Sequence, residues 1–279
     1  MTTDDRSAAS VSSVPQVMGI VNVTPDSFSD GGRFLEVDAA VAHGLALLAE
    51  GASILDVGGE STRPGAAAVP VAEEIARVVP VIEQLAVHGR VSVDTRRPEV
   101  ARAAVAAGAT LINDVSAQLW TVAAELGVGW VAMHMQGEPA TMQLDPTYTD
   151  VVAEVCAFLD QRATEAERAG VTEIWIDPGF GFGKTLEHNL ALLAHLDRVV
   201  ALGRPVLVGT SRKAMLGRIL ADSDGVEQPV DPGDRLAGSI ATEVWAMHRG
   251  AAMIRAHDVR AAVQLSLIHI SEPTRPERI

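Results

Sequence analysis

Short apolar segments and longer amphipathic segments alternate eight times along the chain. The short segments are continuously apolar, which is typical of parallel strands that are buried on both faces. They span residues 18–21, 54–57, 91–93, 111–112, 130–133, 174–176, 206–208 and 253–254. The longer segments are rich in Ala and Leu and have helical spacing, as at 37–50, 73–87, 99–107, 151–169 and 186–202. This alternation predicts eight strand–helix units.

Eight such units in 279 residues indicate a single-domain α/β protein with the (β/α)8 TIM-barrel fold. Glycine follows five of the helical segments just before the next strand, as expected of helix C-caps. These glycines are Gly51, Gly108, Gly170, Gly203 and Gly250. A doubly wound open sheet is the alternative fold that the pattern leaves open. We expect one barrel over residues 14–264, because no linker or repeat divides the chain.

Both ends of the chain depart from this pattern. Residues 1–13 are polar and lack the basic-then-apolar order of a signal peptide, so we expect a disordered tail. After Gln264 the Ala-rich helical pattern stops, and prolines follow at positions 273 and 276. We therefore expect residues 265–279 to be an atypical, non-native tail that does not form a closing helix.

Composition narrows the choice of partners. The net charge is −14 with only 22 Lys and Arg residues, which argues against a nucleic-acid partner. No apolar run is long enough to span a membrane. The single cysteine, Cys156, excludes an internal disulfide and suits a reducing compartment. We expect a cytoplasmic protein that binds small molecules.

Every predicted strand ends on polar residues. In a TIM barrel the C-terminal strand ends surround one pocket, where active sites lie. Carboxylates, amides and separate cations in one pocket suit a ligand that has both a hydrogen-bonding heterocycle and an anionic group. The strand-end residues are Asn22, Asp56, Asp94, Asn113 with Asp114, His134, Asp177, Thr210 with Ser211, and Arg255 with His257.

The segment DPGFGFGKT at 177–185 is similar to a nucleotide-binding loop, but its spacing differs. A P-loop has four residues between its first Gly and the Gly-Lys-Thr, whereas three residues separate Gly179 from Gly183. A dinucleotide fingerprint also fails, because one residue is missing before its third glycine. We interpret this segment as a strand that presents Asp177 beside the aromatic Phe182.

Motifs in eight places together resemble the dihydropteroate synthase family. They are NVTPDSFSDGG at 22–32, GGESTRPG at 58–65, VDT at 93–95, INDV at 112–115, MHMQG at 133–137, DPGFGFGKT at 177–185, GTSRK at 209–213 and IRAHDV at 254–259. The resemblance implies a transferase of folate synthesis. The amine of 4-aminobenzoate would displace diphosphate from 6-hydroxymethyl-7,8-dihydropterin diphosphate and form 7,8-dihydropteroate. Sulfonamides act on this class of enzyme.

The resemblance also implies how the pterin is held. Asp177 would accept two hydrogen bonds from the amino-pyrimidine edge, a fork geometry that suits a carboxylate. Asp94 and Asn113 would contact further polar atoms of the ring, and Lys213 an acceptor on its other side. The catalytic residues would be Asp94, Lys213, Arg255 and His257. Other substrate contacts would be Thr62, Met133, Phe182 and Gly209.

The same resemblance implies which residues would contact the diphosphate and the 4-aminobenzoate. Arg255, His257 and Arg63 would meet the charge of the departing diphosphate, together with Mg²⁺ held through Asn22. Asp94 would stabilise a cation-like pterin. Around the aminobenzoate, Phe28, Pro64 and Phe182 would form the wall, and Ser211 would begin a helix at 212–220 whose N-terminal amides suit a carboxylate.

Three departures from the family pattern limit these expectations: residue 214, the fourth loop and the C-terminal tail. Ala214 follows the Ser-Arg-Lys triplet where the family usually has Ser, and residues 115–120 lack a Gly-rich turn, which predicts a short fourth loop. We expect a homodimer, although the unusual C-terminal tail affects the helices that would form it. A catalytically silent pterin-binding paralogue and a pterin-dependent methyltransferase are the alternatives.

Overall fold

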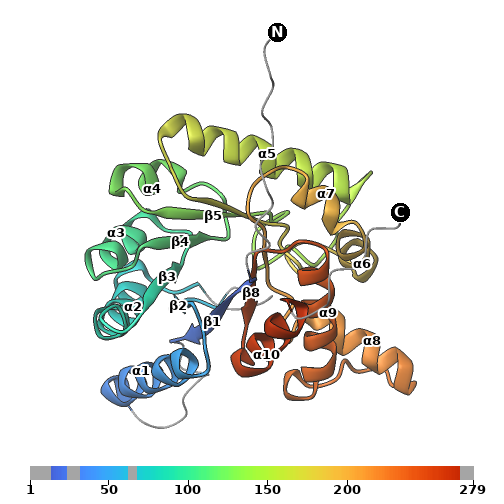
Figure 1. Ribbon diagram of the computed structural model, residues 1–279, viewed down its shortest axis with the longest axis horizontal. Coiled ribbons are helices and arrows are strands. Elements are labelled where there is room, and N and C mark those ends of the chain that lie inside the picture. Colours follow the sequence, from blue (N-terminus) through green and yellow to red (C-terminus); the bar gives the residue numbers. More distant parts are fainter. Residues whose placement is uncertain (1–13, 24–31, 62–67, 271–279) are drawn as a thin grey trace.

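Eight parallel strands form the centre of the structure, a computed structural model that describes residues 14–23, 32–61 and 68–270 (Figure 1). They are β1 (Gln16–Asn22), β2 (Ile54–Gly58), β3 (Arg90–Asp94), β4 (Leu111–Asp114), β5 (Gly129–Met133), β6 (Ile174–Asp177), β7 (Leu207–Val208) and β8 (Met253–Ala256). Their order in the sheet is β6-β5-β4-β3-β2-β1-β8-β7. A parallel bridge from Ile176 to Val206 joins the two edges. The predicted (β/α)8 barrel is therefore confirmed, and the open sheet is excluded.

Helices surround the strands on the outside of this barrel (Figure 1). They are α1 (Gly32–Ala49), α2 (Val71–Leu85), α3 (Pro98–Ala106), α4 (Trp120–Leu126), α5 (Val151–Ala169), α6 (Leu186–Ala194), α7 (Leu196–Val200), α8 (Ala214–Asp224), α9 (Leu236–His248) and α10 (Val259–Ile270), with a short 3-10 helix η2 (Pro232–Asp234) before α9. The segment predicted as one helix at 186–202 is two helices, because the backbone of His195 leaves the helical region between them.

The last helix does not end where the sequence pattern changes. Helix α10 continues through Ile270, six residues beyond Gln264. The expectation that no closing helix forms after Gln264 was wrong for residues 265–270, because both prolines lie further along, at 273 and 276. Ser266 is buried and its hydroxyl donates to the Val263 carbonyl at 2.8 Å. That the tail is non-native stays a prediction.

The interior of the barrel has an apolar half and a polar half. A cluster of buried side chains fills the half near the start of the strands: Met18, Ile54, Leu111, Val131, Trp175, Leu207 and Met253. Side chains two residues apart on a strand point to the same face. The next inward residues are therefore polar on several strands, including Asp56, Asn113, Asp177 and Arg255. The apolar cluster acts as a floor beneath them.

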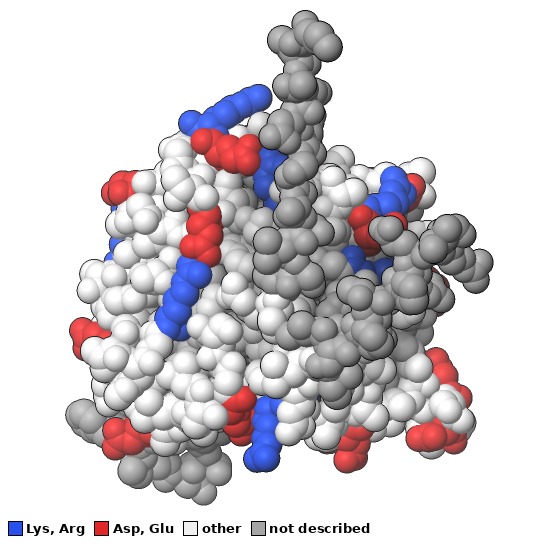
Figure 2. Space-filling model, viewed as in Figure 1, with Lys and Arg blue, Asp and Glu red and all other residues white. Residues whose placement is uncertain are grey.

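The outer surface carries charged side chains of both signs. In the face shown in Figure 2, basic and acidic groups of the described residues stand singly or as neighbouring opposite charges. Within residues 14–23, 32–61 and 68–270, no helix has the length and apolar character needed to cross a membrane.

Candidate active site

A row of hydrogen bonds joins polar side chains from four strands inside the barrel. Asp56 Oδ2 accepts from Asn113 Nδ2 at 2.8 Å and from Arg255 Nε at 2.6 Å. Arg255 Nη2 donates to Asp94 Oδ2 at 2.8 Å. Asp56 is completely buried, so it acts as a support that orients Asn113 and Arg255. The structure thus brings together three of the residues that the resemblance selected, and it adds Asp56 as their common partner.

This interior retains unused hydrogen-bonding capacity. Asp56 Oδ1, Asn113 Oδ1 and Ser92 Oγ are buried and have no hydrogen-bond partner in the described part of the chain. Buried polar atoms usually have partners, since leaving one unpaired costs about 1–3 kcal/mol. Three such atoms in one barrel interior indicate a place where a polar ligand or ordered water completes the bonding.

Asp94 is surrounded by both signs of charge. Burial raises its pKa to about 7, opposed mainly by the neighbouring Arg255 and more weakly by Lys213, whereas Asp56 raises it. Gly58 lies opposite Asp94 in the sheet register, and a Cβ on that glycine would approach the Asp94 Cβ to 3.4 Å. The missing side chain at Gly58 therefore leaves space at the mouth of the barrel beside Asp94.

Asp177 ends β6 and is held by the loop that follows it. Its Oδ1 accepts from the Gly179 backbone N–H at 2.7 Å. Burial raises the pKa of Asp177 to about 6, although that hydrogen bond and the nearby Lys213 and Lys184 lower it. Gly179 has φ +69°, and a Cβ there would collide with the His134 carbonyl oxygen. Glycine is therefore required at position 179 for this tight turn.

Lys213 faces the same group of acids from the loop after β7. Its Nζ lies 4.2 Å from the centre of the Phe182 ring, a cation–π contact. Burial and Arg255 lower its pKa to about 8, whereas Asp177 and Asp94 raise it. Lys213, Phe182, Asp177 and Asp94 thus share one neighbourhood, as the resemblance implied.

Lys184 is a buried residue that the sequence reasoning did not select. Its Nζ lies 2.9 Å from His134 Nδ1 and 2.9 Å from the Gly179 carbonyl oxygen, and it also donates to the Phe182 and His134 carbonyl groups. Burial lowers its pKa to about 7. Lys184 ties the loop after β6 to the end of β5, so it fixes the backbone around Asp177.

His257 stands at the end of β8, beside Ser211 from the loop after β7. The Ser211 Oγ accepts from the His257 backbone N–H at 3.1 Å and lies 3.2 Å from His257 Nδ1. Burial lowers the pKa of His257 to about 3, aided by Arg255 and Arg212. The imidazole is therefore neutral when no anion is bound.

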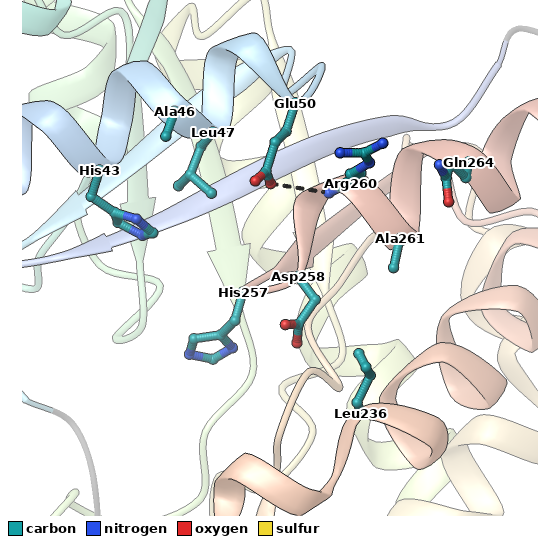
Figure 3. A pocket seen from close by; sticks show the side chains of 10 residues that line it. All are labelled: His43, Ala46, Leu47, Glu50, Leu236, His257, Asp258, Arg260, Ala261 and Gln264. Carbon is teal, nitrogen blue, oxygen red and sulfur yellow. Dashed lines mark hydrogen bonds between the residues drawn. The ribbon is translucent and has the colours of Figure 1, made fainter.

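A pocket of about 350 Å³ lies on the other side of His257, between α1 and α10 (Figure 3). Figure 3 shows His257 and Asp258 side by side at its rim. Across the pocket, Glu50, which directly follows α1, accepts from the Arg260 backbone N–H at 3.2 Å. Among the described residues, none of the interior acids lines this pocket, and His257 is the site residue that does.

Three strand-end residues do not face the site, contrary to the expected convergence of all of them. The Asp114 carboxylate accepts from the backbone of Ser116, Gln118 and Leu119 and shapes the fourth loop, where Ala117 has φ +50°. His134 is bound by Lys184, and Thr210 pairs with Thr242 of α9 at 2.9 Å. These residues have the opposite strand parity from the inward acids, so they fix loops and helices instead.

The expected helix start at Ser211 was also wrong. Helix α8 begins at Ala214, three residues later. Arg212 has φ +56°, a left-handed conformation that a helix cannot include, and its N–H donates to Ser239 Oγ at 2.9 Å. Ser211 therefore belongs to a turn and is not a helix cap.

Four predicted substrate contacts lie outside the described residues: Phe28, Thr62, Arg63 and Pro64. The described segments that flank the second loop are firmly anchored. Arg97 forms an ion pair with Glu60 at 2.9 Å and donates to the Val69 carbonyl oxygen. These contacts fix both ends of the loop at the rim of the barrel.

Asn22, the predicted magnesium ligand, is half-buried at the end of β1. No group of three or more His, Cys, Asp or Glu side chains able to hold a metal occurs in the part of the chain that the structure describes. A single amide oxygen fits only an ion whose other ligands are phosphate oxygens and water, an arrangement that Mg²⁺ favours.

Comparison with known proteins agrees with this geometry. Residues 18–257 match the family of pterin binding enzymes. The dihydropteroate synthase of Mycobacterium leprae is 50% identical over 257 residues, covering 89% of this chain and 90% of that protein. The Escherichia coli K12 dihydropteroate synthase is 48% identical, covering 90% and 89%.

Solved structures match over almost the full chain. The Xanthomonas albilineans dihydropteroate synthase with 4-aminobenzoic acid has a TM-score of 0.85 and 52% identity, with 95% of each chain covered. The Yersinia pestis enzyme in a sulfonamide drug complex has a TM-score of 0.84 and 44% identity, covering 96% of this chain and 98% of that one. The chain therefore belongs to the pterin binding enzymes and, among them, to the dihydropteroate synthase family.

Proposed function

We propose that this protein is a transferase that joins 4-aminobenzoate to 6-hydroxymethyl-7,8-dihydropterin diphosphate, releasing diphosphate and 7,8-dihydropteroate. The observation that carries this proposal is the bonded row Asn113–Asp56–Arg255–Asp94 beside Asp177 and Lys213. This group of neighbouring side chains supports the proposal because its carboxylate and amide oxygens suit the donors of a pterin and its cations suit a leaving anion. A related enzyme from Xanthomonas albilineans is known in complex with 7,8-dihydropteroate.

The carboxylate and amide groups of the site would recognise the pterin ring by hydrogen bonds. The Gly179 N–H donates to Asp177 Oδ1, which leaves Oδ2 free of that bond. The carboxylate would therefore accept from the exocyclic amine and from an adjacent ring nitrogen of the pterin. Asn113 presents a buried Oδ1 that has no partner among the described residues, which suits a ring N–H. Lys213 donates to the ring carbonyl, while Met133 and Phe182 make apolar contacts.

Bond cleavage places negative charge on the diphosphate and positive charge on the pterin methylene carbon. Arg255 bridges Asp56 and Asp94 in the charge row, and His257 follows it two residues further along the chain, so both would meet the leaving oxygens. Asp94, held by Arg255, faces the positive carbon. Arg63 is predicted to join from the second loop. The 4-aminobenzoate nitrogen then bonds to the methylene carbon and loses a proton to solvent.

Mg²⁺ is proposed as the metal, held by Asn22 and otherwise by diphosphate oxygens and water. When bound, it neutralises charge on the diphosphate. The amide of Asn22 is the residue of this chain that would orient it.

The aminobenzoate would lie at the outer rim of the site. Phe182 forms one wall, stacked against Lys213, and Phe28 and Pro64 are predicted to complete it together with Thr62. Gly209 has no side chain to fill the space beside Arg255, where an added Cβ would approach the Arg255 Cβ to 3.7 Å. Ser211 would contribute through its turn, not through a helix N-terminus.

A homodimer is proposed from an apolar outer surface. Helix α6 contacts α8 and α9, and each of these helices exposes large apolar side chains. They are Leu190, Ile219, Leu236, Val244 and Trp245. A second copy of the chain would cover them. A cytoplasmic location stays a prediction.

The test is a coupled diphosphate-release assay with both substrates, with and without Mg²⁺. We expect diphosphate to appear only when both substrates are present, with dihydropteroate in equal amount. A silent pterin-binding protein or a methyltransferase would release none, and that result would refute the proposal.

The activity should have a bell-shaped pH profile. Asp177 and Asp94 must be ionised to accept and to stabilise charge, and burial raises their pKa values to about 6 and about 7. Lys213 must be protonated to donate, and burial lowers its pKa to about 8. The ratio kcat/KM for the pterin substrate should therefore rise between pH 5 and 7 and fall above pH 8. Initial rates in a constant-ionic-strength buffer series measure this, and a flat profile from about pH 5 to 9 would contradict it.

Restoring serine at position 214 should strengthen binding of 4-aminobenzoate. Ala214 is exposed at the first position of α8, directly after Lys213. One added hydrogen bond to the substrate carboxylate contributes about 1 kcal/mol, or about a fivefold lower KM for Ala214→Ser. Steady-state kinetics and sulfonamide inhibition measure both effects. Unchanged values for both ligands would show that position 214 does not contact the carboxylate.

A further inference from the structure

Arg212 has a backbone conformation that suits glycine better than arginine. It lies between Ser211 and Lys213 in a turn that is closed by a hydrogen bond from the Lys213 N–H to the Thr210 carbonyl oxygen at 3.2 Å. The φ of Arg212 is +56°, in the left-handed region that Gly adopts freely and that is unfavourable for most other residues. Such a conformation persists only where the surroundings hold it, so the contacts of Arg212 must offset the strain.

The side chain of Arg212 forms a bidentate ion pair with Asp258. Its Nε donates to Asp258 Oδ2 at 3.1 Å, and its Nη2 donates to Asp258 Oδ1 at 2.7 Å. Two parallel bonds between a guanidinium and a carboxylate fix orientation as well as distance. Asp258 directly precedes α10, yet its carboxylate bonds this arginine, while Glu50 accepts from the Arg260 N–H in the first turn of that helix. The Asp258 side chain thus connects two loops.

This ion pair extends the pairing of β7 with β8 beyond the end of the sheet. Strand β7 has only two residues, and its backbone register with β8 covers those two. Further along, the Ser211 Oγ accepts from the His257 backbone N–H at 3.1 Å, and Arg212 pairs with Asp258. Both links join residues 46 positions apart, the same offset as in the strand register. Side-chain contacts therefore continue the register past the last residues of the strands.

The two partners of the ion pair each adjoin a residue of the proposed site. Lys213 follows Arg212 and would donate to the pterin carbonyl. His257 precedes Asp258, stands beside it in Figure 3, and would meet the leaving diphosphate. We propose that Arg212 is a positioning residue: its ion pair with Asp258 sets the spacing of these two site residues, so that one substrate reaches both. The inference rests on the proposed function, in which the pterin and the diphosphate are two ends of one molecule.

The backbone of Arg212 is held independently of its side chain. Its N–H donates to Ser239 Oγ at 2.9 Å, and its carbonyl oxygen accepts from Arg235 Nη1 at 3.0 Å. Arg212→Gly keeps both bonds, relieves the left-handed strain and removes the link to Asp258. Arg212→Asn does the same with a residue that also tolerates this conformation but is less flexible than Gly when unfolded. Urea denaturation should show both variants folded, with midpoints close to that of wild type.

The test compares binding of the whole substrate with binding of its two halves. Titration calorimetry in a Mg²⁺ buffer measures the Kd values of 6-hydroxymethyl-7,8-dihydropterin, of inorganic diphosphate and of the dihydropterin diphosphate that joins them. In wild type the joined ligand should bind far more tightly than either half, because one bound end holds the other near its site. In Arg212→Gly and Arg212→Asn, the Kd of each half should stay within about twofold, and that of the joined ligand should rise about 10-fold.

Two further variants examine the ion pair itself. Arg212→Lys keeps the charge and loses the fork, so its Kd for the joined ligand should lie between those of wild type and Arg212→Gly. Asp258→Asn loses the charge and one of the two acceptor oxygens, and it should weaken the joined ligand in the same way. Combining Asp258→Asn with Arg212→Gly should add little to the effect of Arg212→Gly alone, because both remove one interaction.

The matched control is Arg249→Gly, which removes another arginine of similar exposure. The Arg249 side chain is 33% exposed and pairs with Asp197 at 3.5 Å, whereas that of Arg212 is 36% exposed. Arg249 directly follows α9 and precedes β8, so it lies at the end of the barrel opposite the strand ends that carry the site. The control should leave all three Kd values as in wild type.

The outcomes separate the role of Arg212 from general damage and from the proposed function. Equal Kd values for the joined ligand in wild type and in both glycine and asparagine variants would overturn the inference. An equal weakening of the joined ligand and of both halves would also overturn it, since that result marks distortion of the whole site. A wild-type enzyme that binds the joined ligand but releases no diphosphate with 4-aminobenzoate would refute the proposed function instead, and the three Kd values would still decide the role of Arg212.

Discussion

Replacing Asp177 with asparagine is expected to lower kcat/KM for the dihydropterin diphosphate by about 10³-fold, because two hydrogen bonds to a charged acceptor contribute about 1.5–3 kcal/mol each. Asparagine keeps one oxygen, which can still accept from the Gly179 N–H that now bonds Oδ1. The other oxygen becomes an NH₂ group that faces a donor of the pterin. The substitution therefore removes recognition and preserves the loop.

A measurement of folding stability distinguishes loss of substrate recognition from loss of the folded structure in Asp177→Asn. The folded-state pKa of Asp177 is raised to about 6 by burial, so its ionised form opposes folding as the pH rises through 6. Asparagine removes that cost, and Asp177→Asn should be at least as resistant to urea as wild type at pH 8. Asp197→Asn, at an exposed position on α7, is the control and should retain full activity. A variant that loses stability in parallel with activity would mean that Asp177 is structural.

The barrel could be predicted from the sequence because its strands are apolar without interruption. Strands buried on both faces read as short apolar runs, and only a parallel sheet covered by helices produces eight of them in alternation with helical segments. The uninterrupted apolar character of the strands also means that the sequence does not show which side chains point into the barrel. Asp114 and His134 end strands just as Asn113 and Asp177 do, and a run without polar alternation does not reveal which residues point inward.

Buried charged residues outside the barrel interior were harder to find. Glu243 occurs in the middle of a helix, where a glutamate normally faces solvent. One signal was present: Ser239 and Glu243 are four residues apart, so two polar side chains share one helical face, and both are buried. The sequence showed Lys184 only as part of a glycine-rich loop. Its four contacts join that loop to the end of β5, and a sequence pattern does not reveal how two separate chain segments pack together.

Replacing Arg255 with methionine is expected to lower both stability and turnover. Arg255 bonds Asp56 and Asp94 at 2.6 and 2.8 Å, and Asp56 is completely buried. Removing one partner of a buried charge pair costs about 3–5 kcal/mol of unfolding free energy, because the remaining charge is left without compensation. Loss of the cation that is proposed to meet the leaving group should also lower kcat by about 10³-fold. Urea denaturation and steady-state rates measure the two effects.

Two comparisons identify the buried charge as the cause. Asp56→Asn in the Arg255→Met background should recover part of the stability and none of the turnover, since it removes the uncompensated charge without restoring the cation. The pKa of Asp94, already about 7 through burial, should rise further without Arg255.

Below the raised pKa the carboxyl group is protonated and carries no uncompensated charge. The stability deficit of Arg255→Met should therefore be smaller at pH 5 than at pH 8. The surface variant Arg218→Met, which breaks a half-exposed pair with Asp222, should cost about 1 kcal/mol or less at either pH. An equal deficit for Arg255→Met at both pH values would show that lost packing, not charge, governs the loss.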